Sequence, residues 1–213
     1  MRMSPDHIAR LLKSDLPGRK SHLKMLPPGR ELVVGQQDID RVKYSSVLLL
    51  LFPDADQLYT CLIKRNASMR HHPGQISLPG GRVEEGESPE RTALRETREE
   101  IGVSPPDVRI LGRLSDLYVS ASRFMIFPYV GWVNHKPDFE LNADEAEKIL
   151  LFPVNLSRKG DEISRLPMKT SLGTIDVPCY PFDGEIIWGA TAMILTEFLD
   201  LIRETRYRPM MLQ

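Results

Sequence analysis

Residues 81–103 read Gly81-Arg-Val-Glu-Glu-Gly-Glu87-Ser-Pro-Glu-Arg-Thr-Ala-Leu-Arg95-Glu96-Thr-Arg-Glu99-Glu100-Ile-Gly102-Val103. The middle of this stretch predicts a helix over residues 88–101. Ser88 can cap its N-terminus, Pro89 suits the first turn, and Gly102 can end it. The stretch therefore predicts a glycine-containing loop that leads into a helix and a second loop.

Three carboxylates of this helix share one face, because Glu96, Glu99 and Glu100 stand at positions i, i+3 and i+4. Like charges at this spacing cost roughly 0.2–0.5 kcal/mol per pair. Arg95 can neutralise Glu99, four residues further on, but not all three carboxylates. A hard cation such as Mg²⁺ or Mn²⁺ would neutralise the rest, since both ions favour carboxylate oxygens. The alternative is a solvated acidic face, which is common on glutamate-rich helices.

The same residues resemble the Nudix box, whose pattern is Gly, five residues, Glu, seven residues, then Arg-Glu-apolar-x-Glu-Glu-x-Gly-apolar. The matching positions are Gly81, Glu87, Arg95, Glu96, Glu99, Glu100, Gly102 and Val103. Thr97 stands where the pattern has an aliphatic residue, and we expect it on the core side of the helix. The resemblance implies an α/β (α+β) Nudix fold, an α/β/α sandwich with a mixed sheet and a loop–helix–loop catalytic box.

The resemblance also implies a reaction in which water cleaves a diphosphate linked to another moiety. By position, the carboxylates of Glu96, Glu99 and Glu100 and the carbonyl of Gly81 are the expected ligands of Mg²⁺ or Mn²⁺. Glu96 is also a candidate base. Arg95 is expected to take part in catalysis by bracing the loop against the helix, together with Glu87.

Family members often recruit a further acidic residue from a later loop. The segment 142–147, Asn-Ala-Asp-Glu-Ala-Glu, is the obvious source, and Glu145 is the expected catalytic residue there. The same acidic residues also suit the start of an ordinary helix, where they would favour the helix dipole. We therefore predict a short acidic helix over residues 142–151, with Glu145 near its beginning.

The segment before the box, residues 65–81, resembles the signature of the coenzyme A pyrophosphatase subgroup. The matching positions are Arg65, Arg70, Gly74, Pro79, Gly80 and Gly81. Asn66 replaces an expected Ser or Ala, Leu78 replaces Phe, and Ile63 replaces Thr. Four of the matching residues, Arg65, Arg70, Gly80 and Gly81, are expected to bind substrate, the arginines by gripping phosphates with their guanidinium groups. The alternative is that Arg65 ends a strand and Arg70 is a solvated loop charge.

The resemblance favours hydrolysis of coenzyme A or acyl-CoA to 4′-phosphopantetheine and 3′,5′-ADP. A first alternative keeps the chemistry but changes the substrate to ADP-ribose, NADH or another nucleotide. A second alternative is a non-catalytic nucleotide-binding regulator, which would be expected to have lost box carboxylates that this chain retains.

Hydrophobic patterning predicts the other elements. Strands are expected at residues 44–52, 58–64, 108–115, 124–133 and 174–180. Helices are expected at residues 5–13 and 186–205, and a long functional loop at residues 65–87. One Nudix domain over residues 1–213, with a helical and irregular N-terminal extension at about 1–40, accounts for this order.

The charge balance excludes some partners. With 28 basic and 29 acidic residues, the net charge of −1 gives no support for binding to nucleic acid or to a membrane surface. The longest apolar run, Val47 to Phe52, is far too short to span a bilayer. The two cysteines, Cys61 and Cys179, suit buried thiols and a reducing, cytoplasmic location. A small nucleotide diphosphate is the expected partner, and the family resemblance adds a possible homodimer.

Overall fold

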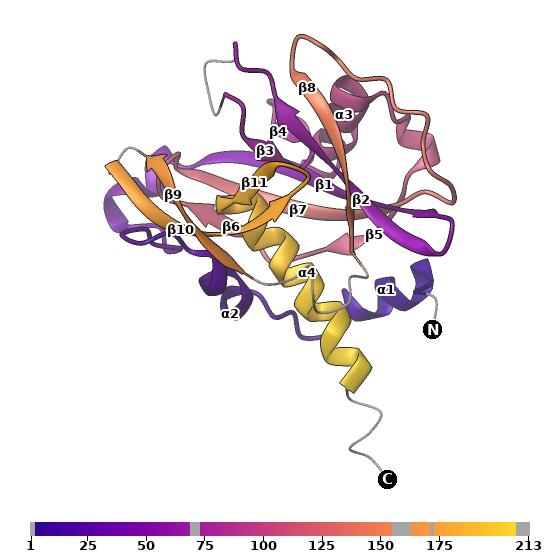
Figure 1. Cartoon of the computed structure of the whole chain (residues 1–213), viewed down its shortest axis with the longest axis horizontal. Coiled ribbons are helices and arrows are strands. Elements are labelled where there is room, and N and C mark those ends of the chain that lie inside the picture. The colour runs from indigo at the N-terminus through magenta and orange to yellow at the C-terminus, as the bar shows by residue number, and fades with distance from the viewer. Residues whose placement is uncertain (1–2, 69–72, 155–162, 171–172, 208–213) are drawn as a thin grey trace.

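The computed structural model (Figure 1) describes residues 3–68, 73–154, 163–170 and 173–207. At its centre β1 (Lys43–Asp54) pairs parallel with β7 (Phe124–Trp132) and antiparallel with β2 (Gln57–Arg65). The main sheet also contains β3 (Ile76–Ser77), β4 (Gly80–Arg82), β5 (Arg109–Arg113), β6 (Leu117–Val119) and β8 (Ala146–Pro153). Parallel and antiparallel pairs make it a mixed sheet, which confirms the predicted fold class.

The strand β1 is buried on both faces of this sheet. Side chains alternate along a strand, so Leu49 and Leu51 join one apolar cluster while Leu48, Leu50 and Phe52 join the other. This double burial explains why the strand reads as a continuous apolar run instead of an alternating one.

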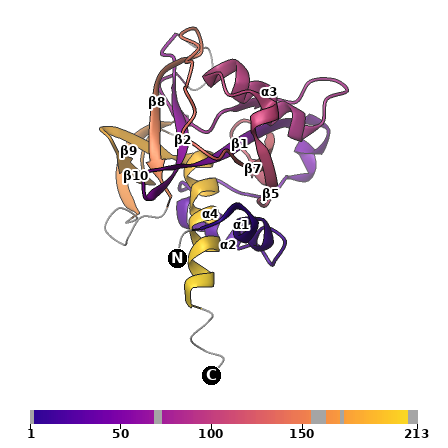
Figure 2. The same ribbon diagram turned by 90° about the vertical axis from the view of Figure 1, so that its right-hand side faces the viewer.

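Helices cover both faces of the sheet, as Figure 2 shows in a view turned by 90° from Figure 1. The helix α3 (Pro89–Ile101) packs Ala93 and Ile101 into the cluster that contains Leu48 and Leu50. On the other face lie α4 (Gly189–Tyr207) and α1 (Pro5–Leu11). Phe198 and Ile8 of these helices pack in the cluster that contains Leu49 and Leu51. The result is the predicted α/β/α arrangement.

The N-terminal segment begins with a helix, as predicted for residues 5–13. Ser4 accepts a hydrogen bond from the backbone of His7 and caps α1, which ends at Leu11 instead of residue 13. Three further short elements follow, namely α2 (Arg19–His22), η1 (Leu23–Met25) and η2 (Gln36–Arg41), and η3 (Pro105–Asp107) lies after α3.

A buried carboxylate anchors this segment to α4. Glu197 accepts hydrogen bonds from the backbone N–H groups of Gly18, at 3.2 Å, and Ser115, at 3.1 Å. Its second oxygen lies 2.8 Å from Nε2 of buried His22. Three segments that are far apart in the sequence therefore meet at one side chain.

The prediction of an acidic helix over residues 142–151 is wrong. Residues 143–145 form a turn, and β8 follows, paired antiparallel with β2 from Ala146 opposite Arg65 to Pro153 opposite Tyr59. Leu150 and Phe152 join one apolar cluster, while the neighbouring Ile149 and Leu151 pack against the other, an alternation between the two faces of the sheet that only an extended chain gives. Pairing with β2 therefore outweighs the local helical pattern.

The last helix begins later than predicted, because residues 185–188 form a strand. A second sheet contains β9 (Ser164–Thr170), β10 (Gly173–Phe182) and β11 (Glu185–Trp188). Asp183 and Gly184 connect β10 to β11 with positive φ values of 51° and 76°, as a type I′ hairpin turn requires. Ile187 is buried as predicted, but on a strand opposite Tyr180.

Both cysteines are buried and free, as expected. Within the described ranges, no helix combines the length and the apolar character that a bilayer crossing needs. The predicted loop at residues 65–87 holds the two short strands β3 and β4, which bring it back to the main sheet beside β2 and β1.

Candidate active site

The helix α3 carries most of the candidate site, and its ends form as predicted. Ser88 accepts a hydrogen bond from the backbone N–H of Arg91 at 3.3 Å, and Gly102 ends the helix in the left-handed conformation at φ 75°. Thr97 is fully buried and donates to the carbonyl oxygen of Ala93 at 2.7 Å. Its hydroxyl is thereby satisfied within the helix, which explains how a polar residue fits where an aliphatic one is expected.

Three carboxylates converge beside this helix. Oxygens of Glu96, Glu100 and Glu145 all lie within 4.8 Å of one another. The first two come from α3, and Glu145 comes from the turn before β8. We call these three residues the acidic cluster. Glu99 lies outside this cluster, with a side chain that is 49% exposed and bonded to Arg95 at 2.9 Å.

Burial makes the cluster costly in the absence of a cation. Desolvation is the largest cause that raises the pKa of Glu100, to about 8, and the charges of Glu96 and Glu145 raise it further. The backbone N–H of Gly80 donates to Glu100 at 2.9 Å and opposes this shift. Desolvation also raises the pKa of Glu96, against the lowering effect of Arg95.

The acidic cluster fits a hard divalent ion. All of its side-chain donors are carboxylate oxygens, which suit Mg²⁺ and Mn²⁺ and do not suit softer metals. A cation would also offset the charge repulsion that raises the pKa of Glu100.

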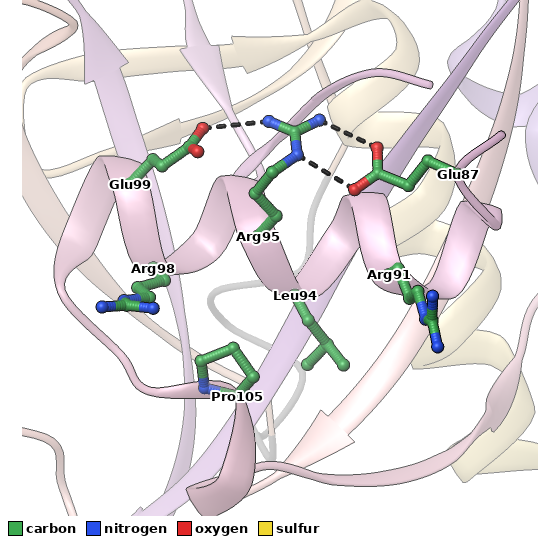
Figure 3. A pocket seen from close by; sticks show the side chains of 7 residues that line it. All are labelled: Glu87, Arg91, Leu94, Arg95, Arg98, Glu99 and Pro105. Atoms are coloured by element: carbon green, nitrogen blue, oxygen red, sulfur yellow. Dashed lines mark hydrogen bonds and ion pairs between the residues drawn. The ribbon is translucent and has the colours of Figure 1, made fainter. Parts of the chain in front are cut away.

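Arg95 links the loop before α3 to the helix, as Figure 3 shows. Its Nε and Nη2 atoms donate to the two carboxylate oxygens of Glu87, both at 3.0 Å, and Nη1 donates to Glu96 and Glu99, both at 2.9 Å. The hydrogen bonds from Arg95 lower the pKa of Glu87 to about 2. This bidentate pair fixes the loop over the helix and leaves part of the guanidinium charge for the acidic cluster.

The strand β4 brings two glycines against the same helix. Gly81 lies opposite Ser46 of β1, and a β-carbon there would overlap the carboxylate of Glu96. A β-carbon on Gly80 would overlap the backbone of Ser46 and Val47. The absence of side chains therefore allows the sheet, the backbone of β4 and the Glu96 carboxylate to approach closely.

Of the two arginines expected to bind phosphate, Arg65 lies at the acidic cluster. Its Nη1 atom is 3.8 Å from the carboxylate of Glu100, and its side chain is 19% exposed. Its Nε atom is buried and has no hydrogen-bond partner among the described residues. Arg70 lies outside the described residues.

The pattern of the box did not point to Asn142, which orients Glu145. Its side-chain amide donates to the Glu145 carboxylate at 3.2 Å, and its side-chain oxygen accepts from the backbone of Asp144 at 3.1 Å. An asparagine directly before a polar turn is a recognisable signal for such a bond, because its side chain can accept from the backbone two residues further on.

An open groove of about 510 Å³ runs along α3 and is lined by Leu94, Pro105 and the side chains of Arg91 and Arg98, among others (Figure 3). At 3.6 residues per turn, Leu94 lies roughly 160° around the helix from Glu96. Arg95 and Glu99 also line the groove, so it borders the acidic cluster at one edge and extends around the helix to Leu94 and Pro105.

The sequence agrees with this geometry, since a profile of the NUDIX domain matches residues 43–167. The chain belongs to the Nudix hydrolase family. The profile match contains all the box residues and the three members of the acidic cluster. The chain is therefore a Nudix pyrophosphatase, as the spacing of the box predicts.

Several relatives in this family are similar over much of the chain. Nudix hydrolase 3 of Caenorhabditis elegans is 29% identical over 80% of this chain and 78% of its own length. A peroxisomal coenzyme A diphosphatase of Mus musculus is 30% identical over 70% of this chain, and one of Caenorhabditis elegans is 35% identical over 57%. The chain spans 56% and 50% of the lengths of these two diphosphatases.

Solved Nudix structures agree with the fold. A MutT/nudix family protein from Enterococcus faecalis aligns with 100% of this chain and 80% of its own, with a TM-score of 0.54 and 19% sequence identity. This likeness concerns the fold alone.

Proposed function

We propose that this Nudix hydrolase cleaves coenzyme A or acyl-CoA to 4′-phosphopantetheine and 3′,5′-ADP. The observation that carries the proposal is the position of Arg65, a signature residue of the coenzyme A subgroup, whose guanidinium lies 3.8 Å from Glu100 in the acidic cluster. The similarity to two proteins named as coenzyme A diphosphatases supports the same substrate.

Mg²⁺ or Mn²⁺ is the proposed cofactor. The carboxylates of Glu96, Glu100 and Glu145 would hold the ion, with the carbonyl of Gly81 and the half-exposed carboxylate of Glu99 as further ligands. A divalent ion at such a site polarises a phosphoryl oxygen and lowers the pKa of a bound water.

The side chains around the acidic cluster have separate tasks in this proposal. Arg65 supplies positive charge for a substrate phosphate through its guanidinium group, whose Nη1 atom lies 3.8 Å from Glu100. Glu96 is the candidate base because of its position in the box, and desolvation raises its pKa above that of a free carboxyl group. Arg95 donates hydrogen bonds to Glu96 and Glu99 and limits their movement.

The test is hydrolysis of a substrate panel with Mg²⁺ or Mn²⁺ and chromatographic identification of the products. The panel contains coenzyme A, acetyl-CoA, dephospho-coenzyme A, ADP-ribose, NADH, a diadenosine polyphosphate and dGTP. We expect kcat/KM for coenzyme A to lead by about tenfold or more, equal to about 1.4 kcal/mol of transition-state stabilisation. Leading activity on ADP-ribose, NADH or another nucleotide would overturn the coenzyme A assignment and leave the family chemistry intact.

Two variants sharpen this test. Glu96→Gln removes the candidate base without changing the size of the side chain, and we expect it to lose nearly all activity on every substrate. Arg65→Gln should raise KM for coenzyme A much more than it lowers kcat, because a phosphate grip acts on substrate and transition state alike. If wild-type protein cleaves no member of the panel with either ion, the binding-regulator alternative replaces the enzymatic one.

A further inference from the structure

Asn66 joins the loop after β2 to the turn that carries Glu145. Its backbone N–H donates to the carbonyl oxygen of Glu145 at 2.9 Å, and its side-chain Nδ2 donates to the carbonyl oxygen of Ala143 at 2.8 Å. Its Oδ1 accepts from the backbone N–H of Ser68 at 2.9 Å. Asn66 therefore forms hydrogen bonds both to the 143–145 turn and to its own loop.

This contact between Asn66 and the turn lies just beyond the last paired residues of β2 and β8. The pairing of β2 with β8 shifts register between Lys64 and Arg65, and the ladder ends with Arg65 opposite Ala146. Residues 143–145 lie beyond that end and cannot be aligned by strand pairing. Two hydrogen bonds continue past the end of the ladder, one from the backbone N–H of Asn66 to Glu145 and one from its carboxamide to Ala143, and only the second depends on the side chain.

The other end of the same turn is attached to α3. The backbone N–H of Asn142 donates to the carbonyl oxygen of Glu100 at 3.0 Å, and its side chain donates to the Glu145 carboxylate. The turn is thus held from α3 on one side and from Asn66 on the other. Glu145 is the member of the acidic cluster that does not come from α3, so its position relative to the other two depends on these attachments and on the turn's own bonds to the carbonyl of Asn142.

We infer that Asn66 is a positioning residue for the acidic cluster, because its carboxamide fixes the 143–145 turn and thereby directs Glu145 toward Glu96 and Glu100. The inference rests on the proposed metal site and identifies how this chain completes it. The coenzyme A subgroup pattern has Ser or Ala at this position, and neither carries a carboxamide. This difference from the subgroup pattern therefore gives the chain the hydrogen bond from the Asn66 carboxamide to Ala143.

The experiment measures Mn²⁺ binding without substrate, by the electron paramagnetic resonance signal of free Mn²⁺ during titration. Loss of a partner that orients a metal ligand costs about 10–100-fold in affinity. We expect Asn66→Ala to weaken Mn²⁺ binding about tenfold, while saturating Mn²⁺ restores most of kcat. Ser68→Ala is the matched control in the same exposed loop, and we expect its affinity to equal that of wild type.

A double-variant cycle identifies the route of the effect. In a Glu145→Gln background, Asn66→Ala should cause no further loss of Mn²⁺ affinity, because the group that it orients no longer binds the ion. Losses that add in full would show that Asn66 acts on something other than Glu145 and would overturn the inference. Thermal unfolding of the metal-free variants checks that each is folded.

The outcomes separate this inference from the proposed function. Wild-type binding with unchanged affinity in Asn66→Ala overturns the positioning role alone. Unchanged affinity in Glu145→Gln overturns it as well and removes Glu145 from the ligand set, while hydrolysis of coenzyme A still stands. Absence of saturable Mn²⁺ binding to wild type overturns both the proposed metal site and the role of Asn66.

Discussion

At the scale of single residues, the burial of Glu100 makes the metal-free protein sensitive to pH. Its pKa rises from 4.5 to about 8, so the folded state binds more protons than the unfolded state between these values. The free energy of unfolding should therefore fall as pH rises through this window. Glu100→Gln cannot ionise and should unfold at a higher temperature than wild type at pH 8.5, by about 2–4 °C per kcal/mol of repulsion and desolvation removed.

This advantage should disappear toward pH 4.5, because Glu100 is then protonated in wild type too. Calorimetry of the metal-free proteins at both pH values measures the difference. Saturating Mg²⁺ at pH 8.5 should reverse the order, since only wild type keeps the full ligand set. A temperature difference that is equal at both pH values would mean that the variant acts through packing and not through charge.

The residues of the box were predictable because their spacing is local. Glu96 and Glu100 lie one helical turn apart, and the helix alone places them together. The approach of Glu145 depends on a turn that the box does not contain, and the attachment of that turn to Asn66 depends on where β2 ends. Spacing within one element predicts its own face and says nothing of how distant loops meet.

At the scale of elements, the contact between β4 and α3 predicts the effect of a single added carbon. A β-carbon in Gly81→Ala would overlap the Glu96 carboxylate, so that the side chain must move away from the acidic cluster. We expect a loss of about 100-fold in kcat/KM, in line with the cost of a displaced catalytic group. Arg82→Ala, at the exposed next position of β4, is the matched control and should keep the Mn²⁺ affinity of wild type.

Steady-state kinetics and Mn²⁺ titration of the two variants test this expectation. Full activity in Gly81→Ala would show that Glu96 has room to retreat without loss, and would remove the steric reason for glycine at this position. A folded Gly81→Ala protein with weak metal binding would support the close approach.

The elements that were predicted wrongly share one cause. Residues 146–153 and 185–188 have sequences compatible with helix, but each is held extended by a partner strand, β2 for the first and β10 for the second. Pairing partners lie outside the window in which periodicity is read. For β11 a local signal was nevertheless present, because Asp183-Gly184 is a strong hairpin sequence.

At the scale of the whole molecule, Glu197 holds together parts of the chain that the sheet does not connect. Glu197→Ala would leave the N–H groups of Gly18 and Ser115 and the buried ring of His22 without their acceptor. We expect the free energy of unfolding to fall by roughly 2–5 kcal/mol, because each buried group left without its hydrogen-bond partner costs about 1–3 kcal/mol. Urea denaturation measures this change.

Asp54→Ala is the control, because Asp54 pairs with Lys136 on the surface, where both side chains are more than 40% exposed. Its effect should be within about 1 kcal/mol. Similar losses in the two variants would contradict a special role for the buried carboxylate.

The hydrogen bonds of Glu197 can form only late in the synthesis of the chain. Gly18 and Glu197 are 179 residues apart, and translation at about 5–20 residues per second separates them by roughly 9–36 s. During that interval Ile8 and Met25 have left the ribosome without the α4 residues that bury them in the finished molecule. These apolar side chains therefore stay without their α4 contacts until the last helix emerges, and slower translation late in the message would lengthen that interval.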